Sequence, residues 1–468
     1  MLFNTLAFVL FFAIVLILYW LIPARYKTHC LLLTSYFFYA FWDWRFLVLM
    51  ISISVANFYL SRSMGDRSGK SRKQLLAFIV SLNLVALATF KYLNFFVESF
   101  ESLLSAFGFK SSFTLINIIL PLGLSFFTFK AISYAVDVYK REMEPTKSII
   151  EFGIFLSYFP YMIAGPIMSA KVMLPQLRVL PAKLTSSSIN SALLLIALGF
   201  FKKTVIGDYS APLVSRIFGN NTYFDWKTLL IGIFAFSLQI YGDFSGYSDM
   251  ARGISRLLGI ELVRNFEEPY LSRNITEFWR RWHISLSTWF RRYLYIPLGG
   301  NRINFQRGLM NLLIVMTIAG LWHGASFTFL IWGAIQGILL IVHKLLFRLN
   351  PLSGKLKHFP LLNIVKIGVT FCTITMVWVF FRAESFHTAM EMLTRIAGKA
   401  GGTFDRMDFL QLLILFAISF STDLIVRRYR SARFVLGTYT SGLAVGILFA
   451  IALSFRASEI VPFVYFQF

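Results

Sequence analysis

Long runs of hydrophobic residues, separated by short polar loops, follow one another along most of the chain. A helix that crosses a bilayer needs about 20 mostly apolar residues. Candidate segments lie at 4–22, 30–41, 46–60, 75–97, 114–137, 150–169, 187–206, 227–250, 309–322, 324–343, 361–381, 409–426 and 434–455. Several of these are too short to cross alone. The pattern therefore predicts an all-α polytopic membrane protein, a single membrane-embedded domain over 1–468, with about eleven transmembrane helices plus re-entrant or interfacial ones.

Charged residues are scarce, and most of them are basic. Only 14% of the residues are charged and 57% are hydrophobic, whereas soluble domains carry about 25% charged residues. The basic loops 62–73 and 138–147 belong on the cytoplasmic side and the more acidic 98–112 outside. The net charge of +23 thus indicates anionic lipid headgroups rather than nucleic acid. The run 4–22 has no basic segment before it, so we interpret it as a transmembrane helix and not as a cleavable signal.

The cysteine content argues against two kinds of site. The chain has two cysteines, Cys30 and Cys372, and both lie in apolar surroundings. Two isolated cysteines form neither a disulfide framework nor a CxxC metal cluster. We therefore expect both to be packing residues, and we expect no metal cofactor.

The longest polar interval, 251–308, is dense in Arg, Trp and Tyr, and we expect it to form an interfacial segment at the cytoplasmic face. Helical periodicity over 275–293 places Phe278, Trp282, Leu286, Trp289 and Tyr293 on one face. One interpretation is an amphipathic helix that rests on lipid headgroups. The other is a helix that holds the phosphates of a nucleotide cofactor, since guanidinium groups bind phosphate bidentately. The candidates for that role are Arg280, Arg281, Arg291 and Arg292.

A histidine lies inside a long stretch that has no Asp, Glu, Lys or Arg. The segment 309–322 rises only about 21 Å as a helix, less than a bilayer core of about 30 Å, so His323 is left within the membrane. Gly320 and Gly324 flank it and permit a break, so we expect 309–343 to be a broken or re-entrant helix pair with His323 at the break. Ionisable groups at membrane depth are usually functional, and a neutral imidazole can accept a proton. The structural alternative is a buried imidazole bonded to a neighbouring carbonyl or carboxylate.

Two further polar clusters interrupt apolar segments. The cluster at 239–249 contains Tyr241 and Asp243 at an expected helix break, and the cluster at 121–130 ends in a lysine. Such groups either bond one another to stabilise a helix bundle or line a water-filled tunnel. On the residues alone, His283 at the flank of the apolar face is more typical of a structural histidine. An enzyme, a transporter or flippase for a polysaccharide precursor, and a non-catalytic scaffold all remain open at this point.

Several motifs resemble those of the membrane-bound O-acyltransferases, and in particular their bacterial alginate O-acetyltransferase branch. They are YGDFSGYSDMA at 241–251, ITEFWRRWHISLST at 275–288, LGGNR at 298–302 and GLWHG at 320–324, with further similarity at 91–95, 121–127, 133–139 and 378–383. The resemblance covers nearly the whole chain and is most specific over 274–324. It implies a ring of membrane helices around a tunnel, with short helices tilted inward.

The resemblance also implies a chemistry. His323 matches the catalytic histidine of the family, and His283 matches its second characteristic polar position. The implied acyl donor is a thioester that arrives from the cytoplasm. We expect it to be acetyl-CoA, with the four arginines as the candidates that bind its phosphates. The residues implied to line the tunnel are Tyr241, Asp243, Trp282, Trp322 and Asn301.

In that branch the acetyl group crosses the bacterial inner membrane and passes to a separate SGNH-type esterase or transferase, which acetylates a polysaccharide. No soluble Ser-His-Asp domain is evident in this sequence, which is consistent with such a partner. The acceptor stays open between alginate, peptidoglycan, cellulose and another exopolysaccharide. In the mechanism we expect, His323 takes the proton of the attacking hydroxyl. His283 orients the donor or gives an N–H to the oxyanion, and Asp243 holds a partner imidazole or lines the acceptor side.

Overall fold

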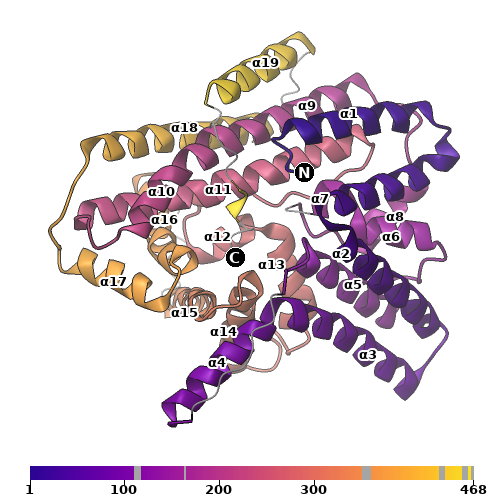
Figure 1. Ribbon diagram of the computed structural model, residues 1–468, viewed down its shortest axis with the longest axis horizontal. Helices are drawn as coiled ribbons and strands as arrows, with labels where there is room; N and C mark the ends of the chain where they lie inside the picture. The colour runs from indigo at the N-terminus through magenta and orange to yellow at the C-terminus, as the bar shows by residue number, and fades with distance from the viewer. Residues whose placement is uncertain (110–117, 163–164, 350–359, 432–437, 456–461, 465–468) are drawn as a thin grey trace. The chain divides into compact units, whose positions relative to one another are not determined.

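The computed structural model describes residues 1–109, 118–162, 165–349, 360–431, 438–455 and 462–464, and most of them are helical (Figure 1). The predicted segments 114–137, 150–169 and 434–455 each lie partly outside the described residues. The all-α class expected from the sequence is confirmed for the part of the chain that is described. The chain divides into two compact units, one made of 1–189 with 254–263 and the other of 190–253 with 264–468.

The first unit contains eight α-helices, counted over its described residues. They are α1 (Leu6–Leu21), α2 (Lys27–Gly65), α3 (Gly69–Leu87), α4 (Leu93–Ala106), α5 (Leu124–Tyr139), α6 (Ile149–Ser157), α7 (Phe159–Met162) and α8 (Ala170–Arg178), with the short turns η1 (Ala24–Tyr26) and η2 (Ala88–Tyr92). The predicted segments 30–41 and 46–60 are the two arms of α2. The helix is kinked at Asp43, where φ is −161° and ψ is 113°. The Asp43 carboxylate accepts a hydrogen bond from the backbone N of Arg45 at 2.9 Å, so the polar break between the apolar runs bends the helix without ending it.

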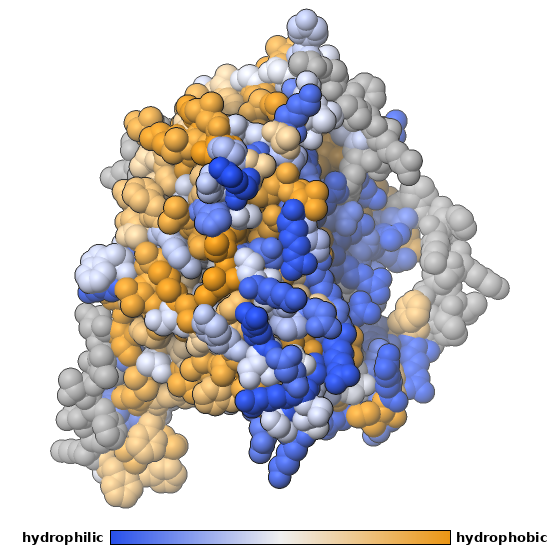
Figure 2. Space-filling view, turned by 90° about the vertical axis from the view of Figure 1, so that its right-hand side faces the viewer, coloured by the Kyte–Doolittle hydropathy of each residue, from blue (hydrophilic) through white to orange (hydrophobic). Residues whose placement is uncertain are grey.

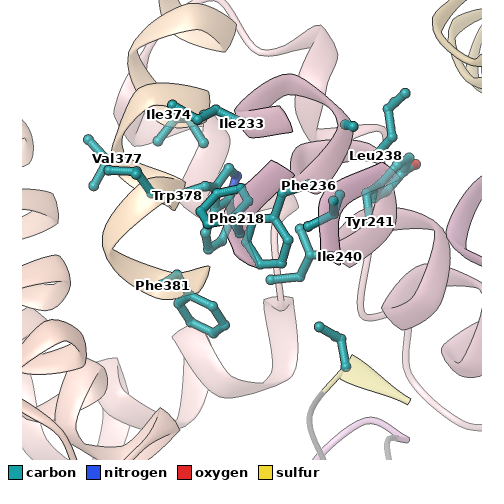
Figure 3. Close-up of a cluster of buried hydrophobic side chains, with 14 of the residues drawn as sticks. Phe218, Ile233, Phe236, Leu238, Ile240, Tyr241, Ile374, Val377, Trp378 and Phe381 are labelled. Atoms are coloured by element: carbon teal, nitrogen blue, oxygen red, sulfur yellow. The ribbon is translucent and has the colours of Figure 1, made fainter. Parts of the chain in front are cut away.

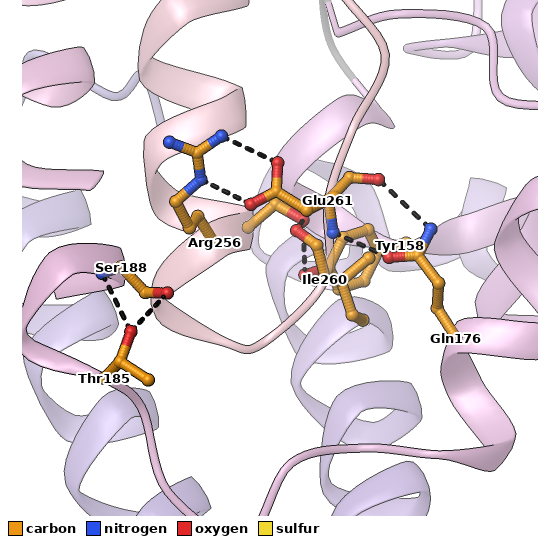
Figure 4. A network of polar contacts seen from close by, with 8 residues as sticks. Tyr158, Gln176, Thr185, Ser188, Arg256, Ile260 and Glu261 are labelled. Atoms are coloured by element: carbon orange, nitrogen blue, oxygen red, sulfur yellow. Dashed lines mark hydrogen bonds and ion pairs between the residues drawn. The ribbon is translucent and has the colours of Figure 1, made fainter. Parts of the chain in front are cut away.

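A polar network joins distant parts of the first unit (Figure 4). Arg256 forms a two-pronged ion pair with Glu261, at 2.5 and 2.7 Å. The side-chain amide of Gln176 bonds both backbone groups of Glu261, at 2.8 and 3.2 Å. The hydroxyls of Tyr158 and Ser255 lie 3.1 Å apart. The segment 254–263 is thereby tied to α6 and α8 although it is far from them in sequence.

The second unit holds most of the residues singled out in the sequence. Its helices are α9 (Ser186–Phe201), α10 (Tyr209–Gly219), α11 (Trp226–Leu257), α12 (Ile275–Arg281), α13 (Ile284–Phe290), α14 (Phe305–His323), α15 (Phe327–Leu349), α16 (Pro360–Arg382), α17 (Phe386–Ala397), α18 (Arg406–Ser431) and α19 (Thr438–Ser454), with the turns η3 (Lys202–Asp208), η4 (Pro269–Leu271) and η5 (Arg291–Tyr295). Large side chains of α11 and α16 pack together in its core (Figure 3). The rings of Phe236 and Trp378 meet edge to face there, with centroids 6.4 Å apart.

The helix break expected within 239–249 is wrong, because α11 runs unbroken through this cluster. Its glycines serve a close approach instead. A Cβ at Gly242 would lie 2.5 Å from the backbone N of Gly207, and one at Gly246 would lie 2.6 Å from the carbonyl oxygen of Gly199. Both distances are shorter than van der Waals contact. Glycine is therefore required for α11 to pack against the backbone of α9 and η3, not for a change of direction.

Eight helical segments are long and apolar enough to cross a membrane, judged by length and composition over the described residues. They are Ala24–Gly65, Gly69–Ala106, Ser186–Gly219, Trp226–Leu257, Phe305–His323, Phe327–Arg348, Leu361–Arg382 and Arg406–Tyr429; Leu6–Leu21 and Tyr439–Ser454 are shorter apolar helices. Apolar side chains along α1 and α18 are exposed, as lipid contact requires. Figure 2 shows broad hydrophobic areas on the face that it draws. The chain is a multi-pass membrane protein.

Candidate active site

His323 is the last residue of α14, and α15 begins four residues later. The two helices pack closely along each other through Gly320 and Gly333. A Cβ on Gly320 would overlap the carbonyl oxygen of Phe329, and one on Gly333 would overlap the carbonyl oxygen of Met316. The glycines therefore set the distance between the helices, and the tight turn that follows places His323 at the tip of the pair.

A methyl group at Gly333 is expected to push α14 and α15 apart, because it would meet backbone atoms that cannot move aside. Gly333→Ala should lower stability by about 1–3 kcal/mol, the usual cost of overpacking. Thermal unfolding of the purified protein in detergent measures the effect. Gly368→Ala in α16 is the matched control, since a Cβ there meets no atom within 4 Å. Equal melting temperatures for the two variants would contradict this account of the helix pair.

The His323 ring is enclosed by aromatic side chains from its own and neighbouring helices. Its centroid lies 4.9 Å from that of Trp322, 5.3 Å from Trp332 and 5.2 Å from Phe381. These rings are buried, and His323 is buried with them at 6% exposure. The last position of a helix lies beside its free carbonyl groups, which favours a positive charge. The position therefore suits an imidazole that takes up a proton during a reaction.

The helix expected over 275–293 is two helices, α12 and α13, with a break at His283. Asn274 starts α12 by accepting a hydrogen bond from Glu277 N at 2.8 Å. His283 has φ 43° and ψ 54°, the left-handed region, which a histidine rarely adopts. The chain turns there, so Phe278 and Trp282 enter the buried core of the unit. Strained backbone of this kind persists where the surrounding structure holds it, and it clusters at functional sites.

The His283 ring is fully buried, at 0% exposure. Its centroid lies 4.6 Å from that of Phe244 and 6.2 Å from that of Trp322. His283 lies between two short helices and outside the candidate membrane spans. Burial among these rings lowers its pKa from 6.5 to about 3, because the charged form loses its hydration. His283 is thus a neutral imidazole at physiological pH.

Both histidine rings lie beside the indole ring of Trp322. Trp322 contacts both imidazoles, at 4.9 Å from His323 and 6.2 Å from His283. Trp282, another predicted site residue, packs nearby in the same unit, with its ring 6.2 Å from that of Tyr241. The ring of Phe266 links the two groups, at 5.1 Å from Trp282 and 6.4 Å from His283. The five predicted residues therefore belong to one set of aromatic contacts, although they come from three separate segments of the chain.

Asp243 has a different role from the one expected. Its carboxylate bonds neither imidazole, for its two oxygens accept from Lys203 Nζ at 2.8 Å and from the backbone N of Val464 at 3.0 Å. Lys203 also pairs with Asp208 at 2.5 Å. All three side chains of this ion cluster are at most 6% exposed. Of the two roles expected for Asp243, these contacts do not favour the one in which it holds an imidazole, and its place on the acceptor side stays a prediction. In the structure its carboxylate neutralises Lys203 and holds the backbone at Val464.

Other residues of this buried polar layer were missed in the sequence. Lys202 pairs with Asp249 at 2.8 Å, and the Tyr241 hydroxyl donates to Asp423 at 2.7 Å. Each of these charged groups lies in an apolar helical segment. The rule that charges at membrane depth are paired or functional could have found Lys202 and Asp423. It could not have named their partners.

The four arginines proposed for phosphate binding lie in different environments. Arg281 pairs with Glu277 at 2.7 Å and points one N–H at the carbonyl of Glu267, at 3.4 Å. Arg280 and Arg291 are exposed, and Arg292 is half-buried with its guanidinium 5.4 Å over the ring of Tyr293. Arg280 and Arg291 are therefore the members of the set that are most accessible to a ligand.

Asn301 is an exposed residue in the loop before α14. Its side-chain oxygen accepts hydrogen bonds from the Tyr295 hydroxyl at 2.6 Å and from Lys344 Nζ at 2.8 Å. These contacts fasten the loop to η5 and α15. The geometry gives Asn301 a part in holding this loop, and these hydrogen bonds do not involve either histidine.

The chain is similar in sequence to known proteins over most of its length. The sequence profile of the membrane-bound O-acyltransferase family matches residues 141–383. The chain is 39% identical to the probable alginate O-acetylase of Pseudomonas putida, over 82% of this chain and 77% of the relative. It is 36% identical to the peptidoglycan O-acetyltransferase of Helicobacter pylori, over 79% and 74%. It is 25% identical to the teichoic acid D-alanyltransferase of Bacillus subtilis, over 58% and 71%.

The profile match includes η3 and α11 to α16, the segment that carries both histidines, Trp322 and the buried ion cluster of Lys203, Asp208 and Asp243. The relatives just named, all transferases or acetylases, extend the similarity well beyond that region. The fold class, the enzyme class and the resemblance seen in the sequence are thereby confirmed. This chain belongs to the membrane-bound O-acyltransferase family and is an O-acyltransferase.

Proposed function

We propose that this protein transfers an acetyl group from cytoplasmic acetyl-CoA across the membrane for the O-acetylation of an extracytoplasmic polysaccharide such as alginate, with an SGNH-type protein as its partner. The observation that carries the proposal is the pair of buried imidazoles that share Trp322. The relatives, an alginate O-acetylase and a peptidoglycan O-acetyltransferase, favour acetyl as the transferred group and a cell-surface polymer as the acceptor.

In the proposed reaction His323 is the general base. Its neutral imidazole takes the proton of the acceptor hydroxyl as that oxygen attacks the carbonyl carbon of the thioester, and the carbonyl becomes an oxyanion. When the carbonyl double bond forms again, the carbon–sulfur bond breaks. The leaving thiolate receives the proton from His323 and returns to the cytoplasm as the free thiol. The end of α14 favours the imidazolium that exists between the two proton transfers.

Turnover of radiolabelled acetyl-CoA by the purified protein in proteoliposomes tests the proposal. We expect release of free CoA together with label in an added polysaccharide acceptor or in a co-reconstituted SGNH-type protein. Acetyl-CoA that stays intact with every acceptor and partner offered would overturn it. Movement of a polysaccharide precursor across the membrane without any thioester would instead favour a transporter.

The two exposed arginines, Arg280 and Arg291, are the expected phosphate ligands of the acyl donor. Arg280→Gln and Arg291→Gln are each expected to raise the KM for acetyl-CoA several-fold with little change in kcat, because a phosphate contact is about equally strong in ground and transition states. Initial rates at varied donor concentration measure this. Arg273→Gln is the matched control, since its guanidinium is occupied by Glu277 at 3.0 Å. A donor KM that stays at the wild-type value in both variants would remove the phosphate role.

A further inference from the structure

Asn265, which the sequence analysis did not single out, holds the turn between α12 and α13. Its backbone carbonyl accepts from Ile284 N at 2.9 Å. Its side-chain Oδ1 accepts from the backbone N of Ser285 at 3.2 Å and from the Ser285 hydroxyl at 2.8 Å. The same oxygen lies 3.1 Å from Nδ1 of His283. One buried side chain thus holds both the left-handed backbone and the ring of His283.

These contacts decide which nitrogen of His283 carries the hydrogen. A backbone N–H can only donate, so the Asn265 atom that faces Ser285 N is the carbonyl oxygen, and the amide nitrogen faces Ser248 Oγ at 3.4 Å. Because that oxygen has no hydrogen to give, Nδ1 of His283 must be the protonated nitrogen. In a neutral imidazole the other nitrogen, Nε2, then carries a lone pair.

Nε2 of His283 is buried and has no hydrogen-bond partner among the residues that the structure describes. It can accept a hydrogen bond but cannot donate one. The expectation that His283 gives an N–H to the oxyanion is therefore not supported, since its N–H is already given to Asn265. The attacking hydroxyl has a single hydrogen, which His323 takes in the proposed reaction. The group that reaches His283 must then be another O–H or N–H of a bound reactant.

We propose that Asn265 is a positioning residue that keeps His283 in the Nδ1-protonated form, so that Nε2 accepts a hydrogen bond from an N–H or O–H group of the acyl donor or the acceptor. This inference rests on the proposed acetyl transfer. It divides the work between two imidazoles with different surroundings: His323 moves a proton, and His283 stays neutral and orients a reactant.

The tautomer is measured directly by nitrogen NMR on full-length protein in lipid, with isotope-labelled histidine. The His283 signal is assigned by its loss in His283→Gln. We expect protonated Nδ1 and bare Nε2 in the wild type, unchanged between about pH 5 and pH 8. Protonated Nε2 in the wild type would overturn the proposal. This measurement needs no turnover, so it can succeed or fail independently of the proposed acetyl transfer.

Three variants test the kinetic consequence. Asn265→Asp keeps an oxygen for Nδ1–H and should retain the tautomer and the rate within about threefold. Asn265→Leu removes that oxygen, and we expect a protonated or mixed Nε2 and a kcat lower by on the order of 10- to 100-fold. Ser285→Ala removes the hydroxyl contact to the Asn265 oxygen but leaves its bond to His283. If Asn265 only stabilised the turn, this variant would also lower kcat. If Asn265 sets the His283 tautomer, kcat should stay at the wild-type value. Wild-type kcat in folded Asn265→Leu would overturn the proposal.

A second buried asparagine, Asn83, serves as the matched control. Asn83, buried in the first unit, bonds the amide of Asn57 at 2.8 Å, so Asn83→Leu removes a similar contact elsewhere and should leave kcat per folded molecule unchanged. The two substrates are then distinguished by KM. A KM that rises only for acetyl-CoA in Asn265→Leu assigns the His283 contact to the donor, and one that rises only for the acceptor assigns it to the acceptor. If Asn265→Leu does not fold, the proposal is tested by the His283 tautomer in the wild type and by kcat of Ser285→Ala.

Discussion

Replacement of His323 by alanine is expected to lower acetyl transfer by about 10²- to 10⁴-fold, the contribution usual for a general base. The alcohol oxygen is a poor nucleophile until its proton is removed, and no other imidazole in the described part of the second unit is the last residue of a helix. Membrane insertion should be retained, because the ring is surrounded by side chains that pack with one another as well as with it. Transfer of label from acetyl-CoA measures the effect.

The control for this variant is His387→Ala, which changes an exposed histidine on α17. It should keep the wild-type rate. Thermal unfolding of both variants separates a chemical defect from a folding defect. Full activity in a correctly inserted His323→Ala protein would exclude His323 as the base, and the acyl-transfer mechanism would need another proton acceptor.

Replacement of Lys203 by methionine is expected to destabilise the protein by about 3–5 kcal/mol. The change removes one cation from between Asp208 and Asp243, which lie 2.5 and 2.8 Å from its Nζ. It leaves carboxylates buried at 0% and 6% exposure without their counter-ion. The Val464 backbone contact to Asp243 should weaken as well. Thermal unfolding in detergent, with the yield of folded protein, measures the loss.

A second variant shows whether charge or packing is responsible. Lys203→Met combined with Asp243→Asn and Asp208→Asn removes the buried charges together and should recover most of the lost stability, since uncompensated charge is the main cost. Arg256→Met is the matched control, because that arginine pairs with Glu261, whose side chain is 59% exposed, and surface ion pairs contribute about 0–1 kcal/mol. A triple variant no more stable than Lys203→Met alone would assign the effect to packing.

The sequence by itself determined the class of the protein and the positions of its two histidines. Apolar runs of membrane length are a local property, and the motifs around His283 and His323 are contiguous in the chain. The end of the helix at His323 could also be expected locally, from a short apolar run and its flanking glycines. Over 275–293 the hydrophobic periodicity predicted one continuous helix, whereas the structure has two helices. The amphipathic pattern continues through His283, whose left-handed backbone separates them.

The tertiary structure alone decided which polar groups meet. Lys203 and Asp243 are 40 residues apart, Tyr241 and Asp423 are 182 apart, and Asp243 and Val464 are 221 apart. No local spacing encodes such pairs, because in a low-dielectric interior each buried charge is stabilised by whichever opposite group the packing brings to it. The same holds for Asn265, whose amide sets the hydrogen on His283 only because the chain folds back at that turn. Local patterns therefore specify elements and candidate residues, whereas protonation and pairing depend on contacts that exist only in the folded protein.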